Sequence, residues 1–146
     1  MWTFAPTVIL PSGPLELPRP VTTLKVLDGW DASRFRVPGR AGETARGSTP
    51  GGVTVSVRGR LGSHEGGVTA GEPAMLATLE RLRLALHDLG PDETFGLAIY
   101  RDGPAVRGLA KCTPLKLEFD LSEPALFAYA LTLRAGEPAI RSGPLV

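Results

Sequence analysis

The sequence has little of the material from which metal and disulfide sites are built. Its 146 residues include one cysteine, Cys112, and two histidines, His64 and His87. A single cysteine forms no disulfide within the chain and builds no cysteine metal site. Neither histidine has a second ligand at a metal-binding spacing, such as four residues along a helix. We therefore expect no metal and no cofactor.

An excess of charge of one sign is also missing. Lys and Arg number 16 against 15 Asp and Glu, which leaves a net charge of +1. This balance provides neither the broad basic field of nonspecific DNA binders nor an acidic tail. Any role with nucleic acid would need a local patch.

Long apolar runs are absent as well. The longest uncharged apolar stretch, residues 124–133, is far below the roughly 18–20 residues that a membrane span needs. The N-terminus has no charged segment followed by an apolar run. We expect no signal peptide and no association with a membrane.

Glycine and proline are frequent instead. The chain has 18 Gly and 14 Pro, together about 22% and just below the roughly 25–30% of low-complexity sequence. Such dense breaks favour many short elements joined by turns. A chain of this length buries about 68–70% of its unfolded surface, which is enough for a core without disulfides or metals.

Five prolines lie in the first twenty residues, at positions 6, 11, 14, 18 and 20. Because proline lacks an amide proton and has a fixed backbone angle, this spacing argues against a helix and against a central strand. We expect residues 1–20 to form an extended arm or an edge strand. Such an arm lies either on a neighbouring subunit or on the surface of its own chain.

Apolar and β-branched segments predict strands at residues 21–27, 35–37, 53–58, 95–100, 105–110, 115–119 and 126–133. Asp28 and Gly29 are expected to end the first strand in a turn. Leu115 is expected to face the core with the alternate residues of its strand. Residues 39–52 carry five glycines and are expected to form a long loop.

The spacing of apolar residues becomes helical at residues 73–89. The apolar stripe consists of Met75, Leu76, Leu79, Leu82, Leu86 and Leu89. Pro73 suits a first helical turn, and Gly90 with Pro91 suits the end. Leu84 lies off the stripe, which makes it available to a second partner.

These elements predict a mainly β chain: an antiparallel β-sandwich or split barrel with one amphipathic α-helix inserted between central strands. The single β-barrel-like domain would span residues 21–138. Residues 139–146 would form a loose C-terminal tail.

No group of side chains has the pattern of an active site. Ser63, His64 and Glu65 are sequence neighbours, whereas a catalytic triad is assembled from distant residues. Residues 39–52 lack the Gly-Lys-Ser/Thr ending of a phosphate-binding loop and lead into a strand. Cys112 has apolar neighbours and is expected in the core. We therefore expect a protein that is not an enzyme.

A small barrel with a helix after its third strand is also the order of an oligonucleotide-binding fold. Such folds bind single strands through basic grooves and aromatic platforms. Aromatic residues make up 6% of this chain, and the predicted strand at 53–58 has none. Binding of single-stranded nucleic acid stays open as an alternative.

The segment VLDGWDAS at residues 26–33, the glycine-rich stretch after it and GVTVSVRGRLG at 52–62 resemble the start of phage distal tail proteins. The order then continues as in that family, with a short leucine-rich helix, a strand, a turn and two more strands. The resemblance covers residues 21–138.

The resemblance implies a structural protein of the virion, assembled in the host cytoplasm. Distal tail proteins form a hexameric ring at the end of the tail tube and join the tube to the tip, hub or baseplate. The implied partners are further copies of the chain and the tube and tip proteins, with DNA only in transit through a central channel. Tail tube, terminator and completion proteins share the same plan and stay open as alternatives.

A ring subunit needs surfaces that contact its neighbours. We expect these surfaces on the proline-rich arm, the glycine-rich stretch with its flanks, and the side of the helix away from the stripe. The candidate subunit-interface residues are Pro11, Pro14, Leu15, Leu17, Trp30, Arg34, Arg40, Arg46 and Leu84.

Overall fold

A computed structural model describes residues 1–36, 38–39, 41–42, 44–64, 67–68, 72–123, 126–137 and 139–145, with the backbone alone at 30–35, 44–51, 62–64, 67–68 and 72. Over these ranges the chain forms nine strands and one helix, which confirms the predicted mainly β fold. The elements are β1 (Thr3–Leu10), β2 (Gly13–Glu16), β3 (Val21–Phe35), β4 (Thr44–His64), β5 (Gly67–Val68), α1 (Glu72–His87), β6 (Phe95–Asp102), β7 (Ala105–Asp120), β8 (Leu126–Ala135) and β9 (Arg141–Ser142).

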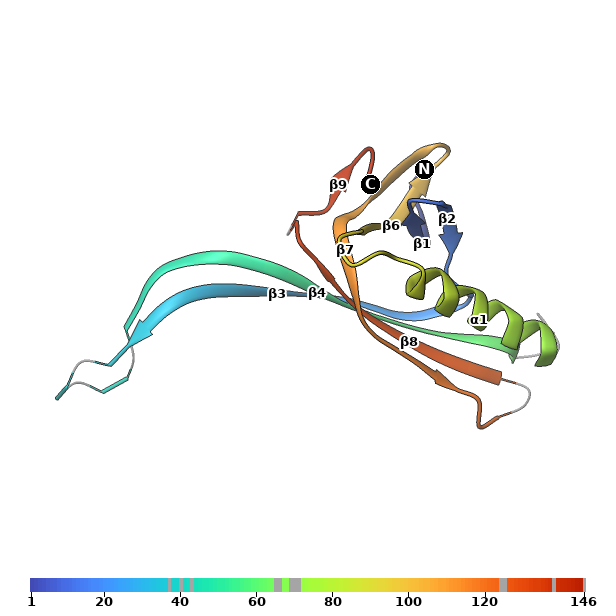
Figure 1. Cartoon of the computed structure of the whole chain (residues 1–146), viewed down its shortest axis with the longest axis horizontal. Coiled ribbons are helices and arrows are strands. Elements are labelled where there is room, and N and C mark those ends of the chain that lie inside the picture. Colours follow the sequence, from blue (N-terminus) through green and yellow to red (C-terminus); the bar gives the residue numbers. More distant parts are fainter. Residues whose placement is uncertain are drawn as a thin grey trace.

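The strands pair in the order β2-β1-β6-β7-β8-β4-β3, with β5 beside β4 and β9 beside β7. Every pairing is antiparallel. β7 serves two layers, because residues 105–112 pair with β6 whereas residues 112–120 pair with β8. The upper layer is therefore β2-β1-β6 with the first half of β7, and the lower layer is β3-β4-β8 with its second half (Figure 1).

The core fills the space between the two layers and α1. Alternate residues of β4 and β8 point into it, as the period of two along a strand requires. α1 adds a stripe of buried side chains, which are Met75, Leu79, Leu82 and Leu86. These four confirm the predicted helical face. The prediction that Leu76 also lies on this face is wrong, because Leu76 is 42% exposed.

The N-terminal residues do not form a free arm. β1 pairs with β2 on one side and with β6 on the other, so the prediction that prolines exclude a central strand is wrong. Pro6 is tolerated because it lies where the register with β6 shifts, between Phe4 and Thr7. β2 is the edge strand that the sequence allowed. The Pro6 carbonyl also accepts a hydrogen bond from the Leu17 amide at 3.1 Å, which ties this hairpin together.

β3 and β4 form a long hairpin that projects well beyond the body of the molecule (Figure 1). The predicted turn at Asp28 and Gly29 is wrong, because a register shift between Asp28 and Trp30 lets β3 continue. The predicted loop at 39–52 is also wrong over most of its length, since β4 begins at Thr44. Phe35 ends β3, and Val37 of the predicted strand 35–37 lies outside the described residues.

Two further predictions change in the second half of the chain. The strands predicted at 105–110 and 115–119 are one strand, β7, and Leu115 is exposed beside a register shift between Pro114 and Lys116. The C-terminal tail is not loose. β9 pairs with β7, and Leu145 is buried against Ala98 and Ala110.

Candidate subunit interface

The lower layer has two edges without a strand partner among the described residues. β3 ends the strand order and pairs only with β4. On the other side, β6 stops at Phe95 opposite Cys112, so residues 113–120 of β7 pair only with β8. An unpaired strand edge presents backbone donors and acceptors that are ready to pair with another chain.

The two free edges run in opposite directions. Each of the three pairings in the layer β7-β8-β4-β3 is antiparallel, so the strands alternate and the outermost two point opposite ways. Each edge also exposes a large apolar side chain, Leu27 on β3 at 60% and Leu115 on β7 at 57%. The β7 edge also carries Pro114, Lys116, Glu118 and Asp120, and charge and proline are the features with which soluble proteins blunt a free edge. The exposed leucines are therefore the features of these edges that favour association.

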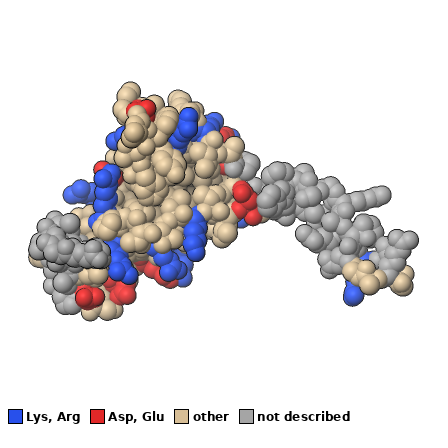
Figure 2. Space-filling view, turned by 180° about the vertical axis from the view of Figure 1, so that it is seen from behind, with Lys and Arg blue, Asp and Glu red and all other residues tan. Residues whose placement is uncertain are grey.

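The outer face of the lower layer, turned away from the core, carries charges of both signs. It presents Lys25, Arg58, Arg60, Lys116, Glu118, Asp120 and Arg134, set among small residues of β4 and β8. Figure 2 shows Lys and Arg next to acidic side chains along the lower edge of the body. A shallow groove of about 550 Å³ on this face runs from Thr23 and Arg58 to Asp120.

Local partners hold the two carboxylates of this face in their charged form. Glu118 forms an ion pair with Lys116. A hydrogen bond and the positive charge of Lys116, with a smaller effect of Arg58, lower the pKa of Glu118. Hydrogen bonds from the Ser122 hydroxyl and amide lower the pKa of Asp120. The face therefore keeps mixed charge near neutral pH.

A buried hydrogen bond fixes the start of β3 against the sheet. The Tyr129 hydroxyl donates to the Pro18 carbonyl at 2.7 Å, and burial raises the pKa of Tyr129. The ring crosses Gly59 so closely that a Cβ there would lie 2.5 Å from Tyr129 Cε1. Glycine at position 59 thus makes room for the aromatic ring that positions the strand at the free edge.

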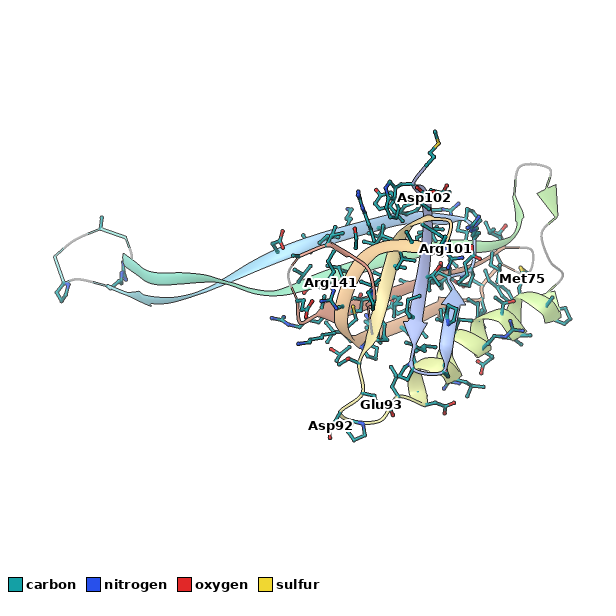
Figure 3. The ribbon with its side chains drawn as sticks, turned by 90° about the horizontal axis from the view of Figure 1, so that it is seen from above. Met75, Asp92, Glu93, Arg101, Asp102 and Arg141 are labelled. Carbon is teal, nitrogen blue, oxygen red and sulfur yellow. The ribbon has the colours of Figure 1, made fainter. Side chains whose placement is uncertain are left out.

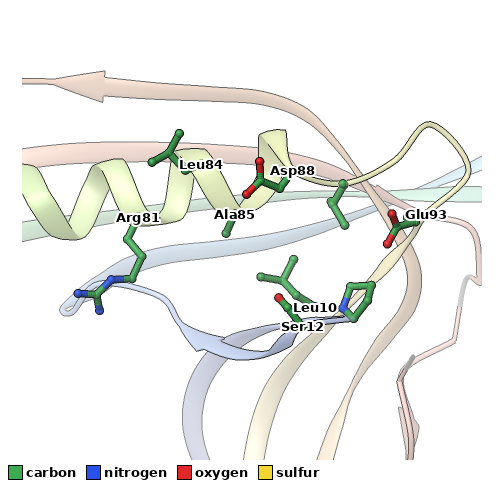
Figure 4. A pocket seen from close by; sticks show the side chains of 9 residues that line it. Leu10, Ser12, Arg81, Leu84, Ala85, Asp88 and Glu93 are labelled. Carbon is green, nitrogen blue, oxygen red and sulfur yellow. The ribbon is translucent and has the colours of Figure 1, made fainter.

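A second hollow lies between α1 and the β1–β2 turn (Figure 4). Its volume is about 410 Å³. Leu10 and Pro11 form one wall, and Leu84 and Ala85 form the other. Leu84 is 55% exposed, so an apolar side chain of the helix faces this hollow without being covered.

The potentially reactive thiol is inaccessible. Cys112 is fully buried, and its Sγ lies 3.6 Å from the Leu109 carbonyl. Burial raises the pKa of this thiol to about 12, opposed in part by a backbone hydrogen bond at Leu97. The predicted core position is confirmed. In the described part of the chain, no three His, Cys, Asp or Glu side chains are close enough to ligate a metal ion.

Within the described ranges, no helix has the length and apolar character needed to cross a membrane.

No family model and no curated protein matches the chain. Among solved structures, a chain from the tail of an empty gene transfer agent particle, refined with helical and C6 symmetry, is similar with a TM-score of 0.57. The similarity covers 97% of this chain and 96% of that one, at 12% identity. A chain of the native gene transfer agent virion gives a TM-score of 0.55 at 10% identity, over 95% of both chains.

The chain shares its fold with these two chains of gene transfer agent particles. At these identities the similarity concerns the fold alone. The distal tail family that the sequence resembles stays a prediction.

The structure divides the predicted interface residues into four groups. Pro11, Pro14 and Leu84 are exposed, whereas Leu15 is partly buried against the core. Leu17 is 1% exposed and packs in the core of its own chain, so its side chain has no surface left for a neighbour. The side chains of Trp30, Arg34 and Arg46, and the whole of Arg40, lie outside what the structure describes. An interface role for the exposed residues stays a prediction.

The sequence did not reveal the free edges of β3 and β7. Leu27 was assigned to a strand and Leu115 to a core-facing position, but a strand pattern does not say which neighbour is missing. The missing information is the point at which β6 stops pairing with β7.

Proposed function

We propose that this chain is a structural, non-enzymatic subunit of a phage-like tail, and that copies of it close into a ring. The observation that carries the proposal is the pair of free, oppositely directed edges on the lower layer. β3 of one copy would pair with residues 113–120 of β7 in the next copy and continue the antiparallel sheet. Because the two surfaces differ, the contact is head-to-tail, which generates a closed ring when the rotation fits.

The number of copies follows by analogy from the C6 symmetry of the similar gene transfer agent tail. Six four-stranded layers would form a barrel about 45 Å across at the backbone, from a strand spacing of about 4.8 Å and a tilt of about 36°. Such a barrel is wide enough for duplex DNA. α1 and the upper layer cover one face of the lower layer, so they would lie on the outside of the barrel. The opposite face of the lower layer, which carries the charged residues named above, would then line the channel.

The charges of that face are of both signs but are not balanced. Five of the seven residues named above are basic and two, Glu118 and Asp120, are acidic. Lys116 and Arg58 lie near Glu118, so only part of the basic charge is compensated locally. We therefore propose that DNA in transit is attracted to the channel wall through its phosphates, in a way that weakens as salt rises and that reads no sequence.

Two positions in the tail are supported by different observations. The sequence resemblance favours a single ring at the distal end of the tube, which would join the tube to the tip. The helical symmetry of the similar tail favours a ring that repeats along the tube. A distal subunit should form single rings in isolation, whereas a tube subunit should polymerise into long hollow tubes at high concentration.

The ring is tested by electron microscopy and sedimentation of the purified chain with edge variants. Leu27→Lys and Leu115→Lys place a charge on an exposed edge position, so each should leave the monomer folded and abolish annular particles. Leu76→Lys, which changes an exposed leucine on α1, is the matched control and should assemble normally. Monomers alone at high concentration, or annular particles from both edge variants, would contradict the proposal.

A further inference from the structure

A partly exposed aromatic patch lies at the end of the upper layer. It consists of Trp2, Phe4, Tyr100 and Arg107, and we call it the aromatic patch. Phe4 and Tyr100 face each other across β1 and β6 in an edge-to-face pair with centroids 5.9 Å apart. The Arg107 guanidinium lies 4.3 Å from the Trp2 ring centroid and donates to the Ser142 hydroxyl at 3.2 Å.

These side chains are held in place and yet remain open to a partner. Phe4 is 44% exposed and Tyr100 is 41% exposed. Tyr, Trp and Arg are the residues that dominate the energy of protein interfaces, because they bury large rigid surfaces at a low cost in conformational entropy. Three such side chains, joined by Phe4 in one ordered group, are more than scattered surface residues require.

The opposite side of the molecule has a hollow with complementary properties. The hollow between α1 and the β1–β2 turn has an apolar lining that includes Leu10, Leu84 and Leu89. Acidic side chains, Asp88 and Glu93, stand at its rim, and Arg81 is the one basic residue among those that line it (Figure 4). Neither acidic residue forms an ion pair with any described residue.

The patch and the hollow lie on the two flanks that a head-to-tail ring brings together. Seen from above, Arg101 and Asp102 lie toward the side on which β3 runs, whereas Asp92 and Glu93 project from the other side (Figure 3). Arg101 immediately follows Tyr100 of the patch, and Asp92 belongs to the loop that closes the hollow. The β3 flank of one copy faces the β7 flank of the next in the proposed ring.

Charge agrees with this arrangement. The patch side carries Arg101 and Arg107, and its acidic residue, Asp102, accepts a hydrogen bond from the Met1 amino group at 3.0 Å. The hollow side carries Asp88, Asp92 and Glu93. Opposite charges across an interface favour the correct pairing of surfaces over self-association of either one.

We infer that the aromatic patch of one copy docks into the hollow between α1 and the β1–β2 turn of the next copy. This inference rests on the proposed ring and adds to it a second contact, outside the channel, made by side chains rather than by backbone pairing. Phe4 and Tyr100 cover the exposed Leu84, and the arginines meet the acidic rim. Pro11 and Leu84, two residues predicted from sequence as interface residues, belong to this contact.

Chemical cross-linking of the full chain tests the contact. Tyr100→Cys and Leu84→Cys are made as separate variants, and the native Cys112 does not interfere because it is fully buried. The two variants are mixed and treated with a short bismaleimide. A covalent dimer is expected from the mixture and from neither variant alone, because the contact joins two different surfaces. Its yield should fall as salt is raised, because the charges are exposed.

The matched control replaces Leu84→Cys by Leu76→Cys, which lies about 12 Å away along the same helix. It should give no dimer. Annular particles without a cross-linked dimer in the Tyr100→Cys and Leu84→Cys mixture would overturn this inference and leave the ring intact. A dimer from Tyr100→Cys alone would also overturn it, since the patch would then bind itself. Absence of both rings and dimers would refute the ring and the docking contact together.

Discussion

Substitution of Tyr129 by Phe tests how the free edge of β3 is positioned. The change removes only the hydroxyl that donates to the Pro18 carbonyl at 2.7 Å. Pro18 is buried, so its carbonyl would lose its partner without gaining water. A buried acceptor left without a partner costs about 1–3 kcal/mol. For a chain of this size, each kcal/mol lowers the melting temperature by about 3 °C, so we expect a decrease of about 3–9 °C.

Thermal denaturation measures the melting temperature, and urea denaturation measures the free energy of unfolding. Both are done at one fixed protein concentration, because assembly would itself add to the apparent stability. Tyr100→Phe is the matched control. Tyr100 is 41% exposed, and the same loss of a hydroxyl there should change the free energy of unfolding by less than about 0.5 kcal/mol. Equal effects of the two substitutions, or no effect of Tyr129→Phe, would refute the reasoning.

Three further predictions concern stability. Gly108→Ala would place a Cβ 1.8 Å from a backbone oxygen of β6, so it should disrupt the β6–β7 pairing and strongly lower the midpoint of urea denaturation. Gly29→Ala is the control and should be tolerated, because the nearest atom to its added Cβ lies at 3.9 Å. Leu82→Ala should lower the free energy of unfolding by about 2–5 kcal/mol because Leu82 is buried, whereas Leu84→Ala should leave monomer stability nearly unchanged. A larger loss of stability from Leu84→Ala than from Leu82→Ala would contradict this prediction. Burial raises the pKa of Cys112 from its usual 9.0 to about 12, so above pH 9 the unfolded chain releases a proton that the folded chain keeps. The free energy of unfolding should then fall by up to about 1.4 kcal/mol per pH unit, and Cys112→Ala should remove this contribution; an unchanged slope between pH 9 and 10 would count against it.

The elements that the sequence predicted well are those in which a local period decides the structure. The valines of β4 at positions 53, 55 and 57 are fully buried, and α1 buries the predicted leucines at 79, 82 and 86. In both cases the apolar period matches one face of a regular element. Such patterns are independent of what lies beside the element.

The predictions that were wrong concern pairing between distant segments. Prolines argued against a central strand at β1, but a register shift at Pro6 and pairing with β6 overcame that local preference. Glycines indicated a loop at 39–52, but β3 supplied a partner along most of that stretch. Local propensity is a weak guide where a strand is stabilised by a neighbour far away in the sequence.

The same limit applies to the candidate interface. Leu84 was found because it breaks a helical stripe, which is a local signal. Tyr100 and Arg107 were not, because the patch exists only after β1, β6 and β7 pair and bring its members into one row. The free edge at 113–120 likewise depends on where β6 ends, which no local pattern in β7 records.

Direct imaging of the assembled particle at a resolution that separates strands is the most direct test of the proposed ring. The proposal predicts β3 of each subunit in antiparallel register with residues 113–120 of β7 in the next, closing one continuous barrel. Particles in which both edges remain unpaired, or in which β3 pairs with β3 of a second copy, would contradict it.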